Sequence, residues 1–126
     1  MARSPYNDML GIRVAEVHDD GLSVEMDVRP ELYNFYGVLH GGASASLLDA
    51  AMGIAITHHF PGKQTATVEL KINYMRPVSE GKLTARARFI KTGKTLIVGE
   101  AMAYREDGKE IARALMTYIL LAGPEA

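Results

Sequence analysis

Residues 41–57 read GGASASLLDAAMGIAIT, and this stretch decides the fold. Its length and its density of Ala, Leu and Met favour an α-helix. At 100° per residue, the helix has a bulky apolar face and an opposite face of small or polar residues. The bulky face carries Leu47, Leu48, Ala51, Ile54 and Ala55, and the opposite face carries Gly42, Ala45, Ser46, Asp49 and Gly53. Because almost none of these residues suits open water, we expect the helix to be buried on most sides.

Alternating apolar and polar residues on both sides of this helix predict β-strands. Before the helix, residues 22–28 alternate strictly, and a turn sequence joins them to a weaker strand at 12–18. In the first strand after the helix, Val68 falls on the apolar face and Thr67 on the polar face. The strands predicted after the helix are residues 67–74, 82–90, 94–104 and 110–121.

Shorter features complete the pattern. Pro5 to Leu10 favours one short helical turn, residues 106–109 favour a hairpin turn, and residues 123–126 favour a frayed tail. One long buried helix with strands before and after it indicates an α+β domain, in which a curved antiparallel sheet of five to six strands wraps around the helix. We therefore predict a single domain over residues 1–126.

The composition limits the possible partners. The 126 residues carry a formal net charge of −1, which gives no electrostatic reason to expect nucleic acid or an anionic membrane. No apolar run approaches the ~18 residues of a membrane span, and the N-terminal MARSPYNDMLG lacks the apolar core of a secretory signal. There is no cysteine, and no spacing among the histidines indicates a metal site. We expect a cytoplasmic protein without metal or cofactor.

Asp49 stands in the middle of the predicted apolar helix. Its neighbours one turn away, Ala45, Ser46 and Gly53, are all small, and they leave space that a substrate or another side chain can fill. A charge is seldom buried without a partner. Asp49 is therefore either a structural residue, held by Ser46 or by a neighbouring strand, or a functional acid.

Gly41 and Gly42 stand where the helix begins. A helix N-terminus presents unpaired N–H groups and a partial positive charge, and glycine lets a ligand approach that backbone closely. Such a site suits a developing oxyanion. The alternative is that the two glycines only make a tight turn from loop to helix.

The spacing of these features has a geometric consequence. Eight residues separate Gly41 from Asp49, which is about 12 Å along a helix. Reacting atoms must come within about 3–3.5 Å of one another. If both residues act on one substrate, we expect Gly41 of one subunit to pair with Asp49 of another.

The segment Asn34-Phe35-Tyr36-Gly37-Val38-Leu39-His40-Gly41-Gly42, followed by Leu47-Leu48-Asp49, closely resembles the hotdog-fold acyl-CoA thioesterases of the PaaI-like type. In that family an Asn precedes His-Gly-Gly, and an Asp follows eight residues after the first Gly. The resemblance continues into Thr67-Val68-Glu69-Leu70 and Asn73-Tyr74-Met75-Arg76-Pro77, so it covers most of the chain. It implies a hotdog fold and a homo-oligomer, a dimer at least and usually a tetramer, with active sites between subunits.

The resemblance also implies roles in the hydrolysis of an acyl-CoA to a free acid and coenzyme A. The Gly41 N–H would polarise the thioester carbonyl, and Asp49 of the other subunit would act as nucleophile or as general base for water. Asn34 would position the water or the thioester, Thr67 would assist the water through its hydroxyl, and His40 would act chemically or stabilise the loop. Aryl or arylacetyl groups are favoured, with medium-chain acyl groups as the alternative.

Several residues are candidates for contacting coenzyme A. Gly42 adjoins the expected oxyanion site, and Arg76, Lys91 and Lys94 are ranked first among the basic residues. Lys91 and Lys94 flank a basic turn that could hold a 3′-phosphate. For each basic residue the alternative is a solvated surface position.

Two other functions compete with hydrolysis. The first is a non-catalytic acyl-CoA binding or sensing module. The presence of the complete set of Asn34, Gly41, Asp49 and Thr67 argues against it. A hotdog dehydratase is suggested by His59-Phe60-Pro61-Gly62, but in those enzymes this segment precedes the central helix, whereas here it follows. We interpret it as the turn that leaves the helix C-terminus.

Overall fold

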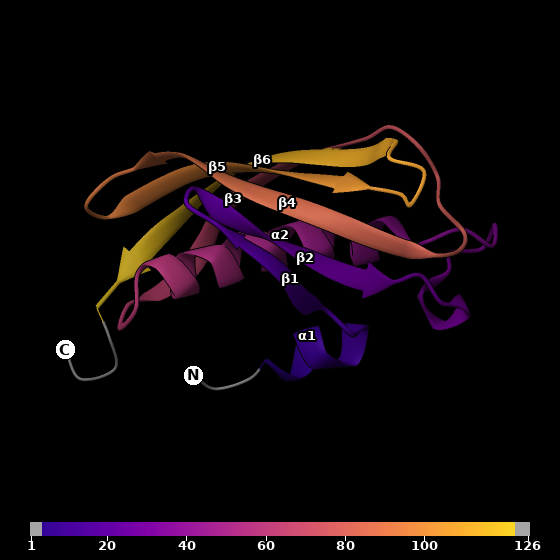
Figure 1. The fold of residues 1–126 in the computed structure, drawn as a ribbon, viewed down its shortest axis with the longest axis horizontal. Helices are drawn as coiled ribbons and strands as arrows, with labels where there is room; N and C mark the ends of the chain where they lie inside the picture. Colours follow the sequence, from indigo (N-terminus) through magenta and orange to yellow (C-terminus); the bar gives the residue numbers. More distant parts are fainter. Residues whose placement is uncertain (1–3, 123–126) are drawn as a thin grey trace.

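A computed structural model describes residues 4–122, in which a six-stranded sheet curves around one long helix (Figure 1). The strands are β1 (Arg13–His18), β2 (Gly21–Asp27), β3 (Gln64–Tyr74), β4 (Lys82–Thr92), β5 (Leu96–Tyr104) and β6 (Glu110–Leu121). The helices are α1 (Pro5–Leu10), the 3-10 turn η1 (Pro30–Leu32) and the long α2 (Gly41–His59). The predicted α+β architecture is confirmed, and the predicted tail at 123–126 lies outside the described residues.

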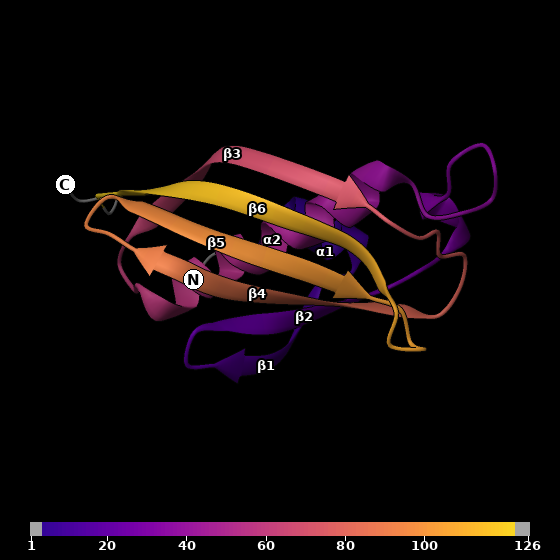
Figure 2. The ribbon, with the colours of Figure 1, turned by 90° about the horizontal axis from the view of Figure 1, so that it is seen from above.

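The sheet has the order β1-β2-β4-β5-β6-β3, and all neighbouring strands are antiparallel. Its two edges are therefore β1 and β3. α2 lies against the inner face of the sheet, and α1 lies on the side of α2 that faces away from it (Figure 1). Seen from above, the strands run across α2 in one layer (Figure 2).

α2 packs its apolar face against β2, β3, β4 and β5. Leu47, Leu48, Ala51 and Ala55 are fully buried, as predicted, whereas Ile54 is only half-buried on the open side of the helix. Met52 is also fully buried, and it approaches the sheet at Gly99, where a Cβ would lie 2.2 Å from the Met52 Cε. A side chain at position 99 would therefore have to displace the end of the Met52 side chain, and its Cβ would lie 3.0 Å from the Arg88 carbonyl oxygen.

Local sequence defines both ends of α2. It begins at Gly41 because His40 caps it, with the His40 Nδ1 accepting from the Gly42 N–H at 2.8 Å. It ends at His59, two residues later than predicted. Gly62 then adopts a φ of 83°, a left-handed conformation that favours glycine. His59 is therefore the last residue of the helix, and Phe60 to Gly62 form the turn that leaves its C-terminus, as predicted.

β3 departs from the predicted alternation at one position. Thr67 pairs with Tyr118 of β6 and Glu69 pairs with Thr117, so Val68 is the extra residue of a β-bulge. The bulge turns Thr67 toward α2 and leaves Val68 59% exposed. The prediction that Val68 lies on the apolar face and Thr67 on the polar face is therefore wrong.

Candidate active site

Asp49 lies half-buried in the middle of α2, and it is held by hydroxyl groups from two strands. The Thr67 Oγ1 of β3 donates to the Asp49 Oδ1 at 2.8 Å. The Tyr118 hydroxyl of β6 also donates to this oxygen, and it lies 2.7 Å from the main-chain carbonyl oxygen of Asp49. The structure thus brings the predicted residues Asp49 and Thr67 together and adds Tyr118 to them.

Tyr118 is the residue of this group that the sequence did not reveal. It is 2% exposed, and burial, together with its hydrogen bond to Asp49, raises the pKa of the phenol. The hydroxyl therefore stays protonated and remains a donor. The alternation of residues 110–121 places Tyr118 on the inward face, but its contact with Asp49 spans 69 positions of the sequence and depends on the fold.

A pocket of about 250 Å³ opens beside Asp49. α1 forms its outer wall, where the Tyr6 hydroxyl lies 2.7 Å from the Ser46 Oγ of α2. A larger, more apolar hollow of about 580 Å³ adjoins it along the small-residue face of α2. The smaller pocket is lined by Tyr6, Asn7, Ser46, Asp49, Ala50, Gly53, Thr65, Thr67 and Tyr118. The space predicted beside Asp49 is therefore present.

The N-terminus of α2 carries one backbone donor that is left over. The Gly42 N–H is taken by the His40 side chain, and the Ala43 and Ser44 N–H groups bond to the His40 carbonyl oxygen at 2.9 and 3.3 Å. Among the described residues, the N–H of Gly41 is the one in this first turn without a hydrogen-bond partner. A helix N-terminus with a free donor suits a partial negative charge.

β3 also holds the Gly41 peptide in place. The Tyr74 hydroxyl donates to the Gly41 carbonyl oxygen at 2.8 Å. A Cβ at Gly41 would lie 3.3 Å from the Tyr74 ring, so glycine permits this close approach. Burial raises the pKa of Tyr74, which keeps its hydroxyl a donor. The first residue of α2 is therefore fixed from the sheet.

Asn34 shapes the loop that leads to α2. Its Oδ1 accepts from the Tyr36 N–H at 2.8 Å and from the Val38 N–H at 3.4 Å. Gly37, in the same turn, has a φ of 77°, which favours glycine. The carboxamide oxygen of Asn34 therefore serves the loop, and His40 at the end of this loop caps the helix.

The three basic residues predicted to contact coenzyme A do not lie close together within a single copy of the chain. Arg76 follows β3 at the Gly41 end of the sheet, and its guanidinium donates to the Glu110 carbonyl oxygen at 2.8 Å. Lys91, near the end of β4, and Lys94, in the turn between β4 and β5, lie at the opposite end of the sheet (Figure 2).

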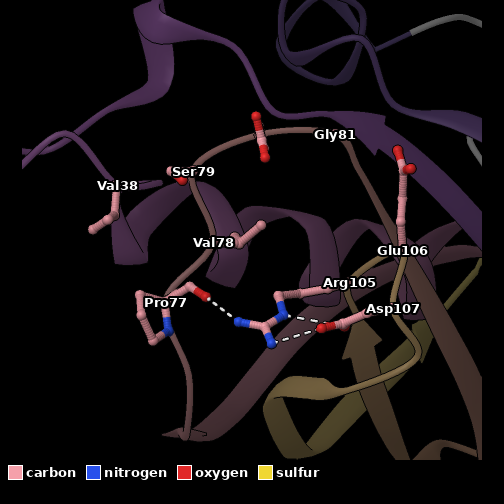
Figure 3. A pocket seen from close by; sticks show the side chains of 9 residues that line it. Val38, Pro77, Val78, Ser79, Gly81, Arg105, Glu106 and Asp107 are labelled. Atoms are coloured by element: carbon pink, nitrogen blue, oxygen red, sulfur yellow. Dashed lines mark hydrogen bonds and ion pairs between the residues drawn. The ribbon is translucent and has the colours of Figure 1, made fainter.

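A third hollow, of about 560 Å³, lies where the β3–β4 connection meets the β5–β6 turn (Figure 3). There the Arg105 guanidinium bonds to Asp107 at 2.8 Å and to the Pro77 carbonyl oxygen at 3.0 Å. The hydrogen bonds from Arg105 lower the pKa of Asp107 to about 2. The other charged lining residues, Glu80 and Glu106, are acidic, so this hollow does not suit a phosphate.

Two further observations concern the described residues only. No three His, Asp or Glu side chains in this range lie close enough together to hold a metal ion. Within residues 4–122, no helix has the length and apolar character that crossing a bilayer requires.

Comparison with known proteins extends these observations. Residues 36–112 match the thioesterase superfamily. A thioesterase family protein from Silicibacter pomeroyi is 32% identical, with 96% of this chain and 92% of that chain covered and a TM-score of 0.88. A thioesterase from Haemophilus influenzae is 28% identical, with 93% and 82% covered and a TM-score of 0.88.

The PaaI protein of E. coli, from the phenylacetic acid degradation operon, superimposes with a TM-score of 0.90 over 96% of this chain and 87% of that chain. At 24% identity this likeness shows the fold alone. The family match, by contrast, spans more than half of the chain and includes the loop before α2, α2 itself and β3. The chain therefore belongs to the thioesterase superfamily of thioester-hydrolysing enzymes and has the hotdog fold.

Proposed function

We propose that this protein hydrolyses acyl-CoA thioesters to a free acid and coenzyme A, at a site built by two copies of the chain. The Gly41 N–H of one subunit polarises the carbonyl, and Asp49 of the partner subunit activates a water molecule. The observation that carries the proposal is Asp49, the one acidic residue of α2, which borders a pocket and accepts a hydrogen bond from Thr67.

In the proposed reaction, Asp49 takes a proton from water as the water oxygen bonds to the thioester carbon. The resulting oxyanion accepts a hydrogen bond from the Gly41 N–H. When the carbon–sulfur bond breaks, the proton held by Asp49 passes to the coenzyme A sulfur. We favour this general-base role over direct attack by the carboxylate on the thioester carbon. Direct attack through an anhydride is the alternative.

Two copies are needed because Gly41 and Asp49 share one continuous helix and lie about 12 Å apart along it. The edge strand β3 offers a pairing surface. Antiparallel pairing of two β3 strands about a twofold axis would lay the Tyr74 end of one copy beside the Gln64 end of the other. Gly41, bonded to Tyr74, would thereby approach Asp49 of the partner subunit. We expect a dimer at least, and a tetramer of two dimers.

The acyl group is proposed to enter the pocket beside Asp49, with aryl or arylacetyl groups favoured over medium-chain ones. The fold shared with a protein from a phenylacetic acid degradation operon supports this preference. For coenzyme A we propose Gly42 and Arg76 on the side of the Gly41 subunit, and Lys91 and Lys94 on the other side. Asn34 and His40 would act by fixing the loop and first helical turn that present Gly41.

The test measures free-thiol release from phenylacetyl-, hydroxybenzoyl-, hexanoyl- and palmitoyl-CoA, for the wild type and for Asp49→Ala and Asp49→Asn. We expect both variants to lower kcat by a factor of about 10² or more, as loss of a general base does. Asp107→Asn, which removes a carboxylate that does not line the pocket beside Asp49, is the matched control and should keep full activity. Absence of turnover on every substrate would favour an acyl-CoA binding module instead.

A further inference from the structure

Tyr118 stands out among the residues around Asp49 because nothing in the proposed reaction yet uses it. Its ring is buried in the core, and its hydroxyl is directed at Asp49 from the neighbouring layer of the structure. The hydroxyl reaches both the carboxylate and the main-chain carbonyl oxygen of the same residue. The contact with the main chain fixes the hydroxyl relative to α2, and the contact with Oδ1 restricts rotation of the Asp49 side chain.

Thr67 and Tyr118 also act on the same carboxylate oxygen. They form a direct cross-strand pair between β3 and β6, and both donate to the Asp49 Oδ1. The bulge at Val68 makes this arrangement possible, because it turns Thr67 to the face that already carries Tyr118. This cross-strand pair thus supplies two hydroxyl donors to the Asp49 Oδ1. Neither hydroxyl donates to the other carboxylate oxygen, Oδ2.

We infer that Tyr118 is a positioning residue, whose hydroxyl fixes the Asp49 carboxylate by its Oδ1 and leaves Oδ2 as the atom that takes the proton from water. This inference rests on the proposed role of Asp49 as the catalytic base. Tyr118 itself is almost fully buried in the wall of the pocket, and its proposed effect on the reaction passes through the Asp49 carboxylate. Because the hydroxyl is buried, water competes little for its hydrogen bond, which keeps the carboxylate in one orientation.

The alternative is that Tyr118 is only a core residue whose hydroxyl satisfies the helix. A double-mutant cycle separates the two interpretations, because a residue that acts through Asp49 has no further effect once the carboxylate is gone. The cycle consists of the wild type, Tyr118→Phe, Asp49→Ala and the double variant, measured by thiol release. Tyr104→Phe is the matched control. Tyr104 is the last residue of β5, and it lies on the opposite face of the sheet because it alternates with the buried Ala101 and Ala103.

We expect Tyr118→Phe to lower kcat about 10-fold, the effect of losing one hydrogen bond to a charged group, with KM nearly unchanged. The same substitution should change nothing in the Asp49→Ala background, and Tyr104→Phe should behave like the wild type. An unchanged kcat for Tyr118→Phe, or an equal loss in both backgrounds, would overturn the inference while leaving Asp49 as the base. Full activity of Asp49→Ala would instead overturn the proposed reaction, and this inference with it.

A second pair of variants removes any dependence on how well Tyr118→Phe folds. Replacing Tyr118 by 4-aminophenylalanine keeps a donor at the end of the ring, whereas 4-methylphenylalanine fills the same space without one. We expect the amino variant to keep kcat within a few-fold of the wild type and the methyl variant to lose about 10-fold. Equal activity of the two variants would show that the donor has no role.

Discussion

The proposed reaction uses two parts of α2, Asp49 in its middle and Gly41 at its N-terminus, and different contacts hold them in place. Asp49 is held by side chains of its own chain, with Thr67 and Tyr118 both donating to its Oδ1. Gly41 offers a backbone donor that none of the described residues uses, although Tyr74 fixes its carbonyl oxygen from behind. One part is organised within a single copy, and the other presents a free group outward.

This difference shows where a fold can place a held carboxylate and where it can place a free N–H group. A carboxylate needs donors around it, and a sheet that curves over the helix supplies them from neighbouring strands. A free N–H occurs naturally at the first residue of a helix, where the chain has no partner for it. On the proposed mechanism, association of two copies places the second feature beside the first. Substitutions that affect one part and not the other can test this distinction.

The largest effect is expected from removing the free donor at Gly41. Proline is tolerated at the first position of a helix, and the extended conformation of His40, with φ −62° and ψ 136°, suits a residue before proline. Gly41→Pro should therefore keep the fold and lower kcat by about 10²–10³, as loss of an oxyanion donor does. Gly41→Ala, which adds a Cβ but keeps the N–H, is the control. Similar kcat values for the two variants would contradict the role of the N–H.

At the Asp49 part, the buried phenol predicts a loss of stability in alkali. The pKa of Tyr118 is raised above the ordinary value of 10.0, so above pH 10 the unfolded chain releases a proton that the folded chain keeps. Stability should then fall as pH rises, by up to about 1.4 kcal/mol per pH unit. Chemical denaturation of the wild type and Tyr118→Phe between pH 9 and 11 measures the difference. Parallel curves for the two proteins would show that the phenol does not titrate as stated.

A smaller effect is expected at the cap of α2. His40→Ala removes the acceptor of the Gly42 N–H, and the free energy of unfolding should fall by about 1 kcal/mol. His40→Asn supplies another acceptor and should recover most of this loss. Thermal unfolding of the three proteins measures the series. If His40→Asn were as unstable as His40→Ala, the contribution of His40 would not be that of a cap.

The smallest effect is expected outside both parts of α2, at the hollow of Figure 3. The pKa of Asp107 is lowered from 3.8 to about 2, so the Arg105–Asp107 pair stabilises the fold above pH 4 and stops doing so as pH falls through about 2. Asp107→Asn should make stability depend slightly less on pH at the acid end, because half of the Asp107 side chain is exposed and solvent screens the pair. A large shift of the acid unfolding midpoint would mean that this pair is more than a surface contact.

The sequence predicts the parts of this architecture that depend on local pattern. Residue type and hydrophobic period were sufficient to predict α2, the order of helix and strands, and the turn at Gly62. The motif around Gly41 and Asp49 was sufficient to predict the family. These features need only neighbouring residues, so a single sequence carries them.

The features that the sequence does not predict depend on register between distant segments. The bulge at Val68 reverses the expected facing of Thr67, because an extra residue in β3 cannot be seen without its partner strand β6. Tyr118 meets Asp49 only once the sheet has folded over α2. The separation of Arg76 from Lys91 and Lys94 likewise follows from the topology of the sheet rather than from charge.

The most direct test of the central claim is complementation between two inactive proteins. Asp49→Ala and Gly41→Pro are unfolded together and refolded, so that mixed dimers form. Each mixed dimer has one site with both residues intact, and random pairing should restore about a quarter of wild-type thiol release. Each variant refolded alone is the control and should stay inactive. If the mixture stays as inactive as the separate variants, although mass spectrometry detects mixed dimers, a site shared between two copies is contradicted.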